Sequence, residues 1–122
     1  MMRYSKEVLN YFFNTQHTGV LRKEDPKVRH EEIGTREQGY LFRFYVRYER
    51  NKIKEAKFQA YGSVSATAAF EYACHWIENK TFEKARQLTA IQIQKALNLP
   101  IFEMHTAFLV ESLFKKTLKG DF

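Results

Sequence analysis

The chain of 122 residues has a formal net charge of +6, sixteen per cent aromatic residues and a single cysteine, Cys74. Its length and aromatic content predict one packed domain over residues 1–122 and exclude a disordered chain, while the interleaving of bases with acids favours a solvated surface over a dedicated nucleic-acid patch. The sequence contains no apolar run long enough to cross a bilayer, and a lone cysteine excludes an internal disulfide and suits the reducing cytoplasm, where we expect the protein.

The first predicted element is a helix over residues 4–13. Ser5 is suited to capping its first turn, and apolar side chains recur behind it at helical spacing. A polar stretch that contains Pro26 breaks any regular structure. Residues 28–33 are the first strand candidate.

A β-hairpin is predicted next. Along residues 40–48 the side chains of Phe42, Phe44 and Val46 share one apolar face, and arginines on the other face mark it as partly exposed to water. A turn at residues 49–52 then allows residues 53–61 to pair back as an antiparallel strand.

Gly62 marks the point where this alternation gives way to a helical pattern, over residues 64–78. Ser63 or Ser65 can cap the new helix. Such a strand-to-helix corner gathers backbone N–H groups and a side chain at one point, as in many ligand sites. A simple packing corner would show the same pattern.

Three more helices are expected, at residues 81–87, 89–97 and 104–118. Thr81 is the N-cap of the first, and Thr89 with Gln92 has the form of a capping box for the second. Strands followed by helices predict the α+β class, here an N-terminal helix, a small three-stranded antiparallel sheet and helices packed on one face.

Three strings in the sequence point to a known family. They are YSKEVLNYFFNTQHTG at residues 4–19, IKEAKFQAYG at residues 53–62, and the run from Asn98 to His105. In this order they resemble the first helix and turn, the strand before the ligand loop, and the entry to the last helix of the iron–sulfur cluster assembly scaffold family, the IscU-like or NifU N-terminal domain. The resemblance covers almost the whole chain and implies that family's fold.

The resemblance also implies a cluster site built from three cysteines, with a histidine and an aspartate nearby. Here Gln38, Ser63 and Thr106 stand at the cysteine positions, Tyr40 stands at the aspartate position, and His105 keeps the histidine. Clusters are held by thiolates, and neutral amide or hydroxyl groups with one imidazole are poor substitutes. We therefore expect a degenerate member with vestigial ligand positions, no bound metal and no cofactor.

The remaining histidines and the cysteine have ordinary interpretations. His105 is either a leftover ligand or a structural histidine that forms a hydrogen bond near a helix N-terminus. Cys74 is expected to be a small buried side chain, about 16 Å along the helix axis from Ser63 and so unable to serve the site. His17 and His30 are expected at the surface.

The scaffold family carries a chaperone-recognition string of the form Leu-Pro-Pro-Val-Lys. The matching run here lacks the second proline and the lysine, and we expect it to be a partner-binding segment: Leu99, Pro100, Ile101, Phe102 and Glu103. The resemblance implies a non-enzymatic protein that binds or modulates other cluster-assembly proteins, such as a cysteine desulfurase, without carrying a cluster.

Two alternatives stay open. A face with Arg43, Tyr45, Arg47 and Lys57 could bind nucleic acid without sequence preference, through charge and stacking. A pocket around Gln38, Ser63 and His105 could instead have been repurposed for a small ligand or for catalysis, although no acid to orient the histidine can be identified.

Overall fold

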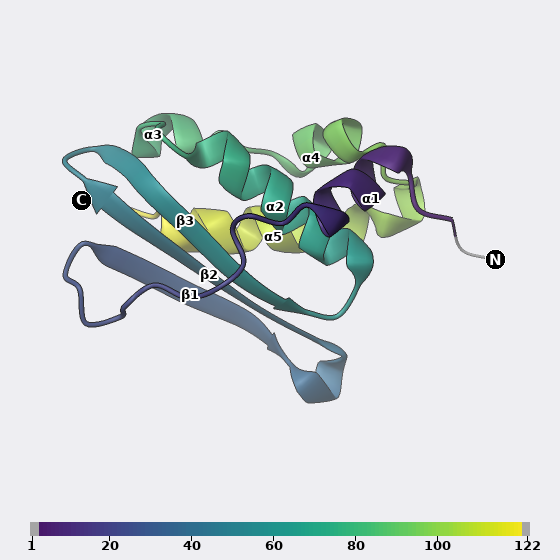
Figure 1. The fold of residues 1–122 in the computed structure, drawn as a ribbon, viewed down its shortest axis with the longest axis horizontal. Coiled ribbons are helices and arrows are strands. Elements are labelled where there is room, and N and C mark those ends of the chain that lie inside the picture. Colours follow the sequence, from purple (N-terminus) through teal and green to yellow (C-terminus); the bar gives the residue numbers. More distant parts are fainter. Residues whose placement is uncertain (1–2, 121–122) are drawn as a thin grey trace.

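A three-stranded antiparallel sheet forms one layer of the molecule, and helices gather on one of its faces (Figure 1). The computed structural model describes residues 3–120. The strands lie in the order β1-β2-β3. The bounds of the elements are, for the strands, β1 (Val28–Thr35), β2 (Tyr40–Glu49) and β3 (Lys52–Tyr61), and, for the helices, α1 (Lys6–Phe13), α2 (Val64–Ile77), α3 (Phe82–Ala85), α4 (Ala90–Leu97) and α5 (Met104–Thr117). The predicted class and order of elements are thus confirmed.

The core lies between the sheet and helices α2 and α5. Phe44 in β2 stacks on Phe114 of α5, with ring centroids 3.8 Å apart. Phe42 and Phe58 both pack against Phe70 of α2, at centroid distances of 5.2 and 5.3 Å. All five rings are buried, and removing a phenylalanine side chain from water contributes about 2–3 kcal/mol. This core fixes the ends of the strands against the helices.

Four helices begin at the hydroxyl caps that the sequence predicts. The side chains of Ser5, Ser63, Thr81 and Thr89 each accept a backbone N–H from the first turn that follows. The capping box at α4 is only half formed, because the Gln92 amide donates to the Tyr72 hydroxyl at 2.9 Å instead of reaching back.

The structure differs from the sequence prediction at several boundaries. Strand β1 runs two residues further than expected because Gly34 and Thr35 still pair with β2. The helix predicted at residues 81–87 keeps only Phe82–Ala85, and two 3₁₀ turns, η1 (Arg36–Gln38) and η2 (Ile101–Glu103), were not predicted. The outermost two residues at each end of the predicted domain lie outside the described part.

None of the helices described is both long and apolar enough to cross a membrane.

The segment between α1 and β1 passes from one edge of the sheet to the other (Figure 1). On its way it pairs with β3, where the Phe58 N–H donates to the His17 carbonyl and the Gly19 N–H donates to the Phe58 carbonyl, both at 2.9 Å. His17 is only 5 % exposed as a result, and Tyr45 in β2 only 3 %. The expectation that His17 lies at the surface is therefore wrong, and Tyr45 does not expose its ring on the face considered for nucleic acid. Neighbours distant in the chain bury them, and local pattern does not reveal such neighbours.

Candidate functional site

A shallow cavity of about 270 Å³ lies where the start of β2, the corner between β3 and α2, and the first turns of α5 meet. It is lined by Gly39, Tyr40, Phe42, Gly62, Ser63, His105, Thr106 and Leu109. The structure thus brings together four of the five vestigial ligand positions, drawn from three separate parts of the chain. The fifth, Gln38, is not among the lining residues, although its neighbour Gly39 is.

Hydrogen bonds within its own 3₁₀ turn keep the Gln38 side chain out of the cavity lining. Gln38 ends the 3₁₀ turn η1, and its N–H donates to the Thr35 hydroxyl at 3.2 Å. The Thr35 hydroxyl in turn donates to the Gln38 side-chain oxygen, also at 3.2 Å. This reciprocal pair closes the turn and holds the amide against β1, at the rim of the cavity.

Ser63 serves the helix that follows it. Gly62 has a φ of +150°, and directly after it the Ser63 hydroxyl accepts the Ala66 N–H at 3.0 Å as the N-cap of α2. The side chain is exposed at the cavity, and its oxygen already has a structural hydrogen bond. Its position suits a ligand, but a neutral hydroxyl is a weak donor for a soft metal.

Tyr40 occupies much of the space beside the corner. Its ring lies 5.3 Å from that of Phe42 and covers Gly34 of β1, where any Cβ would come within 2.5 Å of the tyrosine. Gly34 also has a φ of +87°. The tyrosine therefore places an aromatic ring and a neutral hydroxyl where an aspartate would bring a charged oxygen.

His105 and Thr106 project from the first turn of α5. His105 is exposed, and its ring has no hydrogen-bond partner within the described residues. The interpretation of His105 as a structural histidine thus lacks the hydrogen bond on which it depends. Helix α5 begins at Met104 with no side-chain cap, because the Glu103 carboxylate accepts the Ser65 hydroxyl at 2.7 Å instead.

The donors around this cavity do not fit an iron–sulfur cluster. They comprise one imidazole and three neutral hydroxyl groups, whereas such clusters need thiolates. Cys74 is fully buried within α2, and this burial raises the pKa of its thiol well above the ordinary value. The neutral thiol points into packed protein and gives the cavity no sulfur ligand.

The segment expected to bind partners, residues 99–103, begins in the core and then emerges at the surface. Leu99 is 2 % exposed and belongs to the core, and its N–H donates to the Gln94 carbonyl. Ile101 and Phe102, in contrast, are 86 % and 74 % exposed. Only the second half of the segment is thus free to contact another protein.

On the face considered for nucleic acid, two arginines pair with glutamates of the same protein. Arg43 approaches Glu32 at 3.5 Å and Arg47 approaches Glu55 at 3.2 Å, and Tyr45 is buried against the sheet. A buried ring cannot stack on a base, and the paired arginines offer little free charge. The geometry does not favour this alternative.

Comparison with known proteins settles the family. The family model described as the NifU-like N-terminal domain matches residues 3–120. The chain belongs to this family. It is 31 % identical over 119 residues to the iron–sulfur cluster assembly scaffold protein IscU of Azotobacter vinelandii, covering 97 % of this chain and 93 % of that protein. It is 30 % identical to iron sulfur cluster assembly protein 1 of Encephalitozoon cuniculi, covering 96 % and 84 %, and equally identical to a Drosophila melanogaster relative named an iron–sulfur cluster assembly enzyme.

Solved structures show the same fold as this NifU-like domain. An iron–sulfur cluster assembly scaffold protein for the SUF system from Fervidobacterium islandicum superposes with a TM-score of 0.74 at 18 % identity, covering 95 % of this chain and 96 % of that one. The N-terminal domain of a NifU-like protein from Brucella abortus gives 0.70 at 11 % identity, covering 93 % and 90 %. At these identities the likeness concerns the fold alone.

Sequence reasoning missed one group of chemically active side chains. His17, Glu71, His75 and Glu78 meet where the segment after α1 passes α2. One signal was present in the sequence. Glu71, His75 and Glu78 recur at helical spacing, so the sequence places an imidazole and two carboxylates on one face of α2 and its C-terminal end.

Proposed function

We propose that this NifU-like domain acts in iron–sulfur cluster assembly by binding other assembly proteins, without carrying a cluster itself. The observation that supports the proposal most directly is the lining of the family's ligand cavity, where Ser63 and Thr106 stand at two of the three cysteine positions. A scaffold needs thiolates to hold its cargo. The fold of the scaffold domains is nevertheless kept throughout residues 3–120.

Exposed apolar side chains support a protein partner. Ile101 and Phe102 in η2 and Phe108 in α5, which is 53 % exposed, belong to adjoining elements. Large apolar residues left in water near one another are typical of interaction sites. The formal charge of +6 suits a partner with an acidic surface, and the partner class that we propose is a cysteine desulfurase.

The proposed role is not enzymatic and belongs in a reducing compartment such as the cytoplasm. Catalysis at the cavity could be argued for Ser63 with His105 as its base, but no acid orients His105 within the described residues. The unpaired Cys74 is compatible with a reducing environment.

Anaerobic reconstitution with iron and sulfide tests whether the protein can bind an iron–sulfur cluster. We expect the desalted protein to show no visible absorbance from a bound cluster, because the cavity supplies no thiolate. A stoichiometric protein-bound chromophore would refute the proposal.

Calorimetric titration with the cysteine desulfurase of the same organism tests the partner. We expect binding by the parent protein and at least about tenfold weaker binding by Ile101→Asp or Phe102→Asp, because a charge in an apolar contact must be desolvated. Val20→Asp is the matched control, since Val20 is 57 % exposed but lies in the segment between α1 and β1. Equal loss in all three variants, or no binding by the parent, would count against this surface.

A further inference from the structure

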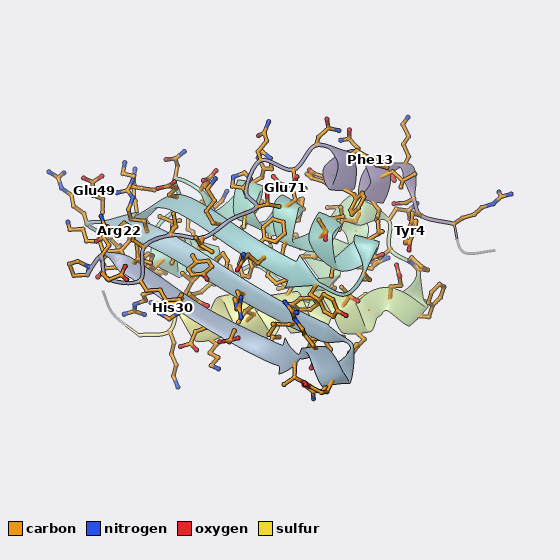
Figure 2. The ribbon with its side chains drawn as sticks, turned by 60° about the horizontal axis from the view of Figure 1, so that its bottom comes forward. Tyr4, Phe13, Arg22, His30, Glu49 and Glu71 are labelled. Atoms are coloured by element: carbon orange, nitrogen blue, oxygen red, sulfur yellow. The ribbon has the colours of Figure 1, made fainter. Side chains whose placement is uncertain are left out.

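A second cluster of potential ligands lies away from the vestigial cavity, around Glu71 of α2. Glu71 follows Ser63 by eight residues, about 12 Å along the helix axis. Figure 2 labels Glu71 near the segment that follows α1. From that segment the His17 ring enters, with Nδ1 at 2.6 Å from Glu71 Oε2. His75, one turn further along α2, brings its Nε2 to 3.1 Å from the same oxygen.

The backbone holds Glu71 in place. Its side chain is fully buried, and Oε1 accepts the N–H groups of Gln16 and His17, both at 3.0 Å. One oxygen therefore anchors the segment after α1, and the other oxygen faces two imidazoles. A carboxylate buried in this way is costly unless positive charge compensates it.

We propose that His17, Glu71 and His75 form a binding site for a divalent transition metal, with zinc as the best match. The three donor atoms, Nδ1, Oε2 and Nε2, lie within 4.8 Å of one another. Zinc bonds of about 2.0–2.1 Å place tetrahedral ligand atoms roughly 3.3 Å apart, so the measured 2.6 and 3.1 Å separations need to open by less than about 1 Å. Two histidines and a glutamate are a ligand set that zinc accepts, with the fourth position left for water.

Glu78 supports the site without binding the metal itself, because it contacts the other ring nitrogen of His17. Its Oε1 lies 2.7 Å from His17 Nε2, the ring nitrogen that faces away from Glu71. A carboxylate at that position fixes the tautomer, so that Nε2 carries the proton and Nδ1 is free to bind metal. It also balances charge, because a divalent ion between two carboxylates gives a neutral cluster.

The open side of the site lies at His75, whose side chain is 44 % exposed while those of His17 and Glu71 are 7 % and 0 % exposed. Metal and water can therefore enter without unfolding the protein. Without metal, the same groups form a hydrogen-bonded clamp. Burial opposes a charge on His17, but its hydrogen bonds to Glu78 and Glu71 raise its pKa. A proton then occupies the place that the metal would take.

Zinc binding by the 122-residue chain tests the assignment. Protein stripped of metal by a chelator is titrated with zinc at about pH 8, which lies above the pKa of a free imidazole. We expect one zinc per chain, together with a higher midpoint of thermal unfolding, because zinc binds only the folded site. The chain has four histidines, and three of them serve as separate probes.

His75→Gln removes the exposed ligand without opening the core, and we expect it to weaken zinc binding by at least about tenfold. His105→Gln, at the vestigial cavity, and His30→Gln, on the sheet, should leave the affinity unchanged. Absence of zinc binding by the parent would show that the cluster is a hydrogen-bonded clamp only. Loss of binding in His105→Gln with retention in His75→Gln would place the metal in the vestigial cavity. Either result would overturn the assignment.

Discussion

Ser63 has a structural role that the structure shows directly. The family resemblance places a cysteine ligand at this position, and the structure shows its serine hydroxyl accepting the Ala66 N–H at the start of α2. Serine is among the best N-caps, and an N-cap contributes typically about 1 kcal/mol. The serine thus secures the start of α2, and it offers a hydroxyl where the resemblance implies a soft thiolate.

Gly34 and Gly39 distinguish two reasons for a glycine: a backbone with positive φ, and a lack of space for a side chain. Both have a φ near +90°, but a Cβ at Gly34 would meet the Tyr40 ring and the Tyr40 carbonyl oxygen at 2.5 Å, whereas a Cβ at Gly39 would meet nothing within 4 Å. We expect Gly39→Ala to lower the free energy of unfolding by about 1 kcal/mol, for its backbone alone. Gly34→Ala should lower it by about 3 kcal/mol, because overpacking adds to the backbone strain. Urea denaturation measures both, and equal losses would mean that Tyr40 moves aside freely.

At the scale of elements, α4 depends on support from α5. The Ala90 N–H at the start of α4 donates to Glu111 Oε1 at 2.6 Å, and Glu111 Oε2 pairs with Lys115 at 2.9 Å. Burial favours the neutral acid, but the Lys115 ammonium and the Ala90 N–H together hold the pKa of Glu111 below its ordinary value. The charged carboxylate is therefore the form that stabilises the junction between the two helices.

Glu111→Gln should consequently destabilise the protein in a pH-dependent way. A carboxyl whose pKa is lowered by folding stabilises the native state above its unfolded pKa, and this contribution is lost as the pH falls through the folded pKa. We expect a difference of about 1 kcal/mol from the parent at pH 7 that shrinks towards zero in acid. Urea denaturation across this range measures it, with the exposed Glu49→Gln as control. A difference that does not change with pH would contradict the charge-based account.

Elements whose signals are local could be predicted, whereas long-range contacts could not. Ser5 and Thr81 allowed the starts of their helices to be predicted, because an N-cap bonds to a backbone N–H only three residues further along the chain. Alternating apolar residues likewise reveal the hairpin. His17 gave no such signal, because its burial depends on pairing with β3 and on two glutamates more than fifty residues away. At the vestigial cavity the resemblance indicated which positions to inspect, but the turn that draws Gln38 towards Thr35 emerges only in three dimensions.

At the scale of the whole molecule, the vestigial cavity is a product of the fold. Tyr40, Ser63 and His105 come from the start of β2, the end of the β3–α2 corner and the start of α5. Their meeting depends on the packing of α2 and α5 against the sheet, which does not require a ligand. The geometry of the cavity therefore does not depend on a bound ligand.

Introducing three thiols tests whether this cavity has the geometry of a metal site. In a His75→Gln background, the combination Gln38→Cys, Ser63→Cys and Thr106→Cys adds three soft donors beside His105, enough for tetrahedral zinc. We expect one more zinc per chain than in the matched parent, and a higher melting temperature in its presence. Zinc stoichiometry and thermal unfolding are the measurements. A folded variant that binds no additional zinc would show that Gln38 and Tyr40 have closed the site.

The short pairing of residues 17–19 with β3 bears on how the protein behaves at high concentration. A sheet edge with unpaired N–H and carbonyl groups can recruit the edge of another molecule and seed aggregation. Here Phe58, in the middle of the outer strand β3, already has both its N–H and its carbonyl engaged by the chain itself. The clamp of His17 between Glu71 and Glu78 holds that cover in place. Colloidal stability is thus tied to two carboxylates outside the sheet, one within α2 and one at its C-terminal cap.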